Sequence, residues 1–144
     1  GGLVAGRDDL RPWLVRRLRR RWKRLLRELD AEDRDPVALH ALRLRGKHAR
    51  YATDALLPIL GADPAPFVKP LRKLQSCLGD HHDGHDALEW LASLPEPSRA
   101  ALLGHLGDPI RRRMKSRLRQ FRRLRRRLAV PKVLDSLRRP AAAR

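Results

Sequence analysis

The sequence predicts an all-α fold: an antiparallel bundle of four to six helices in a single domain spanning residues 3–139. Leu, Arg and Ala dominate the composition, and all three are good helix formers. Aromatic residues make up only 4% of the 144 residues. Apolar residues recur at helical spacing between breaks that contain Pro and Gly. Because the predicted connections are short, consecutive helices should pack antiparallel.

Two helices are predicted in the N-terminal half, on either side of an acidic connector. The first covers about residues 11–29. The second begins at Asp35-Pro36, which is typical of an N-cap followed by the first helical position, and runs to about residue 57. The first helix has an apolar stripe at the spacing of one helical face, formed by Leu14, Leu18, Trp22, Leu25 and Leu29.

Glycine and proline are expected to divide the C-terminal half into further helices. Gly79 should end a third helix, Pro95 should follow the end of a fourth, and Pro109 should begin a long final one. The expected ranges are about 66–78, 83–94, a short helix at 98–106, and 109–129, with a short tail helix after Pro131.

The composition limits the classes of protein and partner. Lys and Arg number 34 against 16 Asp and Glu, which gives a formal charge of +18. Since like charges repel, this excess predicts a polyanionic partner: nucleic acid, an anionic membrane or a polymeric phosphate. One cysteine, Cys77, excludes an internal disulfide framework and a Cys-rich zinc module. No apolar run approaches the ~18 residues that a membrane span requires.

The chain has no initiator Met, and it is expected to begin after a tag or a cut. Gly1 and Gly2 are therefore not expected to contribute to the fold.

The first and last long helices are basic and free of acids. Residues 11–27 hold nine Arg or Lys, and residues 111–127 hold eleven. A solvated face would explain any one of these side chains, but ordinary surface helices mix signs to gain ion pairs four residues apart. The absence of acids therefore favours an anion-binding role, for which the candidates are Arg16, Arg20, Lys23 and Arg117.

The second predicted helix carries a basic row between two apolar flanks. With His40 at 0° on a helical wheel, Arg43, Lys47 and Arg50 fall between about 280° and 340°. A solvated face would lie opposite the apolar residues, so the row is predicted to face inward and line a groove or pore. The flanks are Leu39, Leu42, Ala49, Thr53 and Leu56 on one side and Leu44 and Tyr51 on the other.

Arg45 and His48 lie on the far side of this helix and are expected to be solvated.

Burying the three cations without partners would cost several kcal/mol each, so they must meet protein acids, water or a ligand. One alternative is an internal salt-bridge network through Asp54, Asp80 or Asp83. The other is an anion site, which suits arginine because its guanidinium grips two phosphate oxygens at once. His40 could donate to phosphate, although a hydrogen-bonded core role for it is equally open.

Two motifs resemble those of a known family, the CHAD domain (conserved histidine α-helical domain). The segment His40-Ala-Leu-Arg43-Leu-Arg-Gly-Lys47-His-Ala-Arg50-Tyr51 resembles its H-x-x-R-(I/V/L)-x-x-K-x-x-R-Y signature. About thirty residues on, Leu74-Gln75-Ser-Cys-Leu78-Gly79-Asp80-His-His-Asp83 resembles its L-Q-x-x-L-G-D-x-x-D segment. Together the motifs account for about residues 39–94.

The resemblance implies a helical module that binds inorganic polyphosphate through basic residues and associates with polyphosphate granules in the cytoplasm. It assigns ligand contacts to His40, Arg43, Lys47 and Arg50, with Lys73 as a further candidate. Asp80 and Asp83 would orient cations or cap a helix. It implies no cofactor and no catalytic activity.

A full CHAD domain resembles two such units, each with its own histidine motif, and this chain has one. A fragment, a reduced form and half of a homodimer all remain open.

The sequence is also compatible with other functions. Asp80, His82 and Asp83 belong to an Asp/His-rich string that suggests Mn²⁺ or Fe ligands and a metal-dependent phosphohydrolase. The string is similar to that of DHH phosphoesterases, but those enzymes need strands, which are not predicted here.

Non-specific nucleic-acid binding, sensitive to salt, is expected from charge alone. Trp13, Trp22 and Trp90 fit core positions at least as well as base stacking, and the apolar stripes are needed for the core rather than for a membrane.

Overall fold

A computed structural model describes the backbone of residues 2–30 and 35–137, and the side chains in these ranges from residue 10 onward. Within these residues the protein has five helices and no strand, which confirms the all-α prediction. The helices are α1 (Gly2–Asp30), α2 (Pro36–Ile59), α3 (Ala65–Ser93), α4 (Ser98–Arg125) and α5 (Val133–Ser136). None of the described helices is both long enough and apolar enough to cross a bilayer.

Three predicted helix boundaries were wrong. Gly79 lies inside α3 and Pro109 inside α4, so each of these helices is continuous where two were expected. The first helix begins at Gly2 instead of near residue 11 and includes Pro12. An interior glycine costs a helix only about 1 kcal/mol, and packing of α3 along α4 outweighs that cost. The N-cap at Asp35 is confirmed, since its carboxylate accepts a hydrogen bond from the Val37 amide at 3.4 Å.

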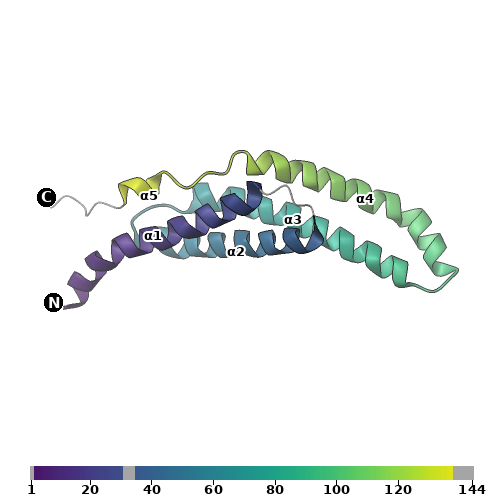
Figure 1. Cartoon of the computed structure of the whole chain (residues 1–144), viewed down its shortest axis with the longest axis horizontal. Coiled ribbons are helices and arrows are strands. Elements are labelled where there is room, and N and C mark those ends of the chain that lie inside the picture. The colour runs from purple at the N-terminus through teal and green to yellow at the C-terminus, as the bar shows by residue number, and fades with distance from the viewer. Residues whose placement is uncertain (1, 31–34, 138–144) are drawn as a thin grey trace.

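The helices pack in chain order: α1 on α2, α2 on α3, and α3 on α4 (Figure 1). The hairpin of α3 and α4 extends well beyond the ends of α1 and α2, and the chain then returns so that α5 lies near α1 (Figure 1). Two contacts hold the C-terminal segment against α1. Arg125 donates a hydrogen bond to the Leu29 carbonyl at 3.3 Å, and Arg19 forms an ion pair with Asp135.

The hydrophobic core lies mainly where α1, α2 and α3 meet. Leu18, Trp22 and Leu25 of the predicted stripe are at most 1% exposed, while Leu14 is half-buried. Of the three tryptophans only Trp22 is in the core, because Trp13 and Trp90 are 45% and 62% exposed. The expectation that all three fit core positions is therefore wrong for two of them.

A buried hydrogen bond fixes the register of α1 on α2. The indole Nε1 of Trp22 donates to the Thr53 hydroxyl at 3.0 Å, and that hydroxyl donates to the Ala49 carbonyl at 2.6 Å. Thr53 is fully buried. Since a buried donor without an acceptor is costly, this bond holds α2 at one rotation about its axis.

Close approach of α3 and α4 depends on Gly84. A Cβ added there would lie 2.5 Å from Met114 Cγ and 2.9 Å from its Sδ, which is far inside van der Waals contact. The absence of a side chain at this position lets the two long helices pack together.

Thr53→Val should destabilise the protein by about 1–3 kcal/mol, because it keeps the side-chain shape but leaves the Trp22 indole without its acceptor. The measurement is urea unfolding followed by far-UV circular dichroism, which does not depend on Trp22. In a Trp22→Phe background the same substitution should cost clearly less. An equal cost in both backgrounds would contradict a structural role for the hydrogen bond.

Candidate anion-binding site

A groove runs between α2 and α3 and encloses about 670 Å³. Its basic lining is His40, Arg43, Lys47 and Arg50 from α2, here called the motif row, and Arg72 from α3. Gln75, Ser76 and Gly79 of α3 form the facing side. The structure thus brings the two sequence motifs together on opposite walls of one groove, here called the motif groove.

Helical periodicity positions the motif row at the edge of the core. Leu42, Ala49 and Thr53 are buried against the neighbouring helices, and the row lies beside them around α2. On its other flank, Leu44 and Tyr51 are 42% and 51% exposed. The second flank is therefore not packed against protein, and the expected inward-facing row is corrected to a row along a groove that is open to solvent.

Neighbouring groups orient the cations of the row. Lys47 Nζ lies 5.7 Å and Arg50 Cζ 4.8 Å from the centre of the Tyr51 ring, both within the range of cation–π attraction. The Arg43 guanidinium lies along the backbone at Gly79, where an added Cβ would be 3.8 Å from Arg43 Cζ. Arg50 Nε is buried and has no hydrogen-bond partner in the structure.

The motif row is not neutralised by carboxylates of the described residues. None of its three Lys and Arg side chains forms a salt bridge there, so the predicted alternative of an internal network is not what this part of the chain shows. Asp80 and Asp83 both line the groove, against Arg43, Lys47, Arg50 and Arg72. Asp80 is engaged by α4, since Arg117 Nε lies 2.7 Å and Arg113 Nη2 3.2 Å from its Oδ2. The groove therefore keeps an excess of positive charge.

Other predicted contacts lie elsewhere. Arg16, Arg20 and Lys23 are exposed on α1, which packs against α2, and none of them lines the motif groove. These three candidates for anion binding therefore lie outside the motif groove.

Lys73 is also exposed and does not line the motif groove, whereas the adjacent Arg72 does. Helical spacing could have found Arg72, because it is seven residues before Gly79 and shares its face. Arg117 is half-buried and reaches the groove only through its contact with Asp80.

The Asp/His-rich string is dispersed around α3. His82 Nε2 lies 3.2 Å from Asp86 Oδ2, while Asp80 is held by the α4 arginines. The His82 ring also faces the His40 ring at a centroid distance of 5.3 Å. Among the described residues, no three His, Cys, Asp or Glu side chains are close enough together to hold a metal ion.

Burial lowers the pKa of His81 below its usual 6.5, and the nearby His85 and His82 lower it further. The folded state therefore binds this proton less readily than the unfolded state. By linkage, His81 does not lower the free energy of unfolding above about pH 6.5. The free energy of unfolding decreases as the pH falls through the window just below that value.

Acidification from about pH 7.5 to 5.5 should consequently destabilise the wild-type protein more than His81→Gln, which cannot take up the proton. The measurement is the urea midpoint at each pH. The other titrating groups are common to both proteins, so identical losses of stability would contradict the assignment to His81.

A family model described as CHAD domain matches residues 3–92. The match covers α1, α2 and almost all of α3, including every residue of the motif row. No curated protein and no solved structure matches the chain.

Proposed function

The chain belongs to the CHAD domain family, and from that premise we propose that it binds inorganic polyphosphate in the motif groove. The polymer runs along α2 in contact with the motif row, and Arg72 faces it from α3. The proposed role is binding, without catalysis, as a targeting or scaffolding module at polyphosphate granules.

One observation carries the proposal: the motif row shares a single open groove and meets no carboxylate partner among the described residues. Cations held this close together repel one another, and an anion between them relieves the repulsion.

The chemistry of the lining suits a repeating phosphate chain. Arg43 and Arg50 can each offer two parallel N–H donors to adjacent phosphate oxygens, and Lys47 adds a compact charge between them. Binding releases the counterions condensed on the polymer, so affinity should fall steeply as salt is added. Leu44 and Tyr51 line the groove and are exposed, so a polymer can enter it from solvent on this side.

Arg43→Ala and Lys47→Ala should each weaken polyphosphate binding about 10–100-fold, since each removes a charged hydrogen bond worth about 1.5–3 kcal/mol. The charge-matched control is Arg112→Ala, an exposed α4 residue outside the motif groove, which should change affinity less than about threefold. The measurement is titration calorimetry with long-chain polyphosphate at fixed salt. Equal losses in all three variants would show that only net charge matters.

Nucleic acid is the competing polyanion. At matched phosphate concentration and salt, polyphosphate should bind more tightly than duplex DNA or single-stranded RNA, because among its described lining residues the groove offers only the exposed rings of Tyr51 and His40 for base stacking. The measurement is competition against labelled polyphosphate. Tighter binding of either nucleic acid, lost in Arg43→Ala, would assign the groove to nucleic acid instead.

A further inference from the structure

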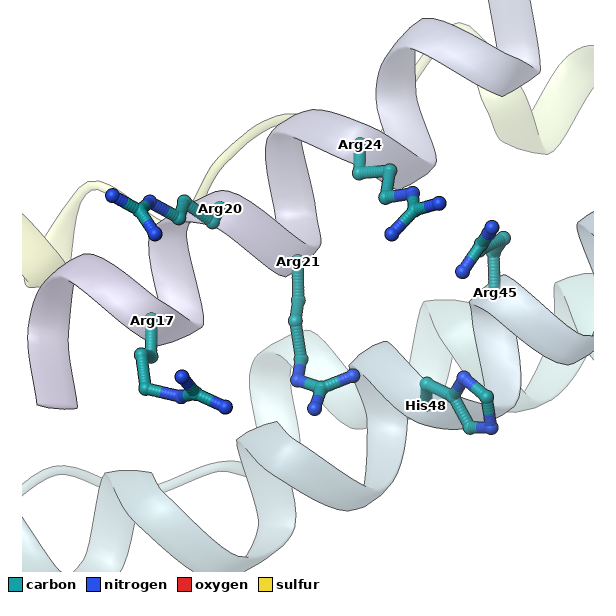
Figure 2. A pocket seen from close by; sticks show the side chains of 6 residues that line it. All are labelled: Arg17, Arg20, Arg21, Arg24, Arg45 and His48. Carbon is teal, nitrogen blue, oxygen red and sulfur yellow. The ribbon is translucent and has the colours of Figure 1, made fainter.

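A second basic groove lies on the other side of α2, where it meets α1. It encloses about 220 Å³, a third of the volume of the motif groove. We call it the arginine groove. Its lining consists of Arg17, Arg20, Arg21 and Arg24 from α1 and Arg45 and His48 from α2 (Figure 2).

Several of these side chains converge on the space between the helices. Figure 2 shows Arg21 extending from α1 toward α2, and Arg24 and Arg45 pointing toward one another across the groove. Arg20 points away from the others in this view. It also lines a neighbouring hollow along α1.

Three of the arginines are held in place by fixed neighbours. Glu28 Oε1 accepts a hydrogen bond from Arg45 Nε at 3.1 Å and lies 3.8 Å from Arg24 Nε. Because both contacts use Nε, the terminal nitrogens remain available to a ligand. Arg17 Cζ lies 4.8 Å from the centre of a Trp13 ring, which orients its guanidinium.

Charge in the arginine groove is far from balanced. Five guanidinium groups line it, and within the described residues Glu28 is the one carboxylate in an ion pair with any of them. Arg45 and His48 were expected to be solvated, but Arg45 is half-buried in this contact. Oriented cations in such excess, with free terminal donors, are the arrangement that selects a compact anion of high charge.

We propose that the arginine groove is a second anion site that binds a short oligophosphate, a chain of two or three phosphate groups. Its small volume suits a compact ligand, and its convergent guanidinium groups suit the high charge density of such a chain. The site goes beyond the proposed function, since none of its lining residues belongs to the motif groove.

Each groove contains its own reporter, His48 in the arginine groove and His40 in the motif groove. The experiment is a titration with tripolyphosphate, followed by the imidazole ¹H–¹⁵N signals and assigned with His48→Gln and His40→Gln. Both signals should shift and saturate. The double variant Arg17→Ala/Arg21→Ala should weaken the His48 response at least tenfold and leave the His40 response unchanged.

Two further double variants complete the design. Arg43→Ala/Lys47→Ala should weaken only the His40 response. Arg112→Ala/Arg119→Ala removes the same charge from exposed positions of α4 and should change either response less than about threefold.

A His48 signal that does not saturate, or one that responds equally in the Arg17/Arg21 variant and the α4 control, would overturn the second site. Loss of the His40 response alone would contradict the proposed function and leave this inference standing. Thermal unfolding of every variant within about 2 °C of wild type confirms that the folded protein is being compared.

Discussion

The fixed rotation of α2 about its own axis is the constraint on which the rest of the structure depends. The buried Trp22–Thr53 hydrogen bond and the buried face of α2 hold that rotation. A helix buried along one face has two edges at the margin of the core. In this protein one edge meets α3 and carries the motif row, while the other meets α1 and carries Arg45 and His48. A rotation of α2 would disrupt both grooves together.

Two acidic residues beside the grooves, Asp80 and Glu28, stabilise contacts between helices. Asp80 ties α3 to Arg113 and Arg117 of α4, and Glu28 ties α1 to Arg45 of α2. These pairs neutralise arginines at helix crossings. Positive charge that these pairs leave unbalanced lines both edges of α2, where an external polyanion is the natural counter-charge.

Sequence patterns predicted the features that local rules determine. The all-α fold, the α1 stripe around Trp22 and the N-cap at Asp35 follow from periodicity and capping, and the structure confirms them. The helix boundaries predicted at Gly79 and Pro109 were wrong, because tertiary packing keeps α3 and α4 continuous across residues that often end helices.

The wheel placed the motif row correctly beside the core, but it could not show what packs on the far flank. Leu44 and Tyr51 are apolar and yet exposed, so the row is open to solvent. Nor could a wheel for one helix reveal that α1 approaches the opposite edge of α2, which puts Arg20 into a different groove.

The most direct test of polyphosphate binding in the motif groove is a crystal structure grown with long-chain polyphosphate. The account predicts phosphate density along the motif groove in contact with Arg43 and Lys47. An empty motif groove, with phosphate bound only elsewhere on the surface, would contradict it.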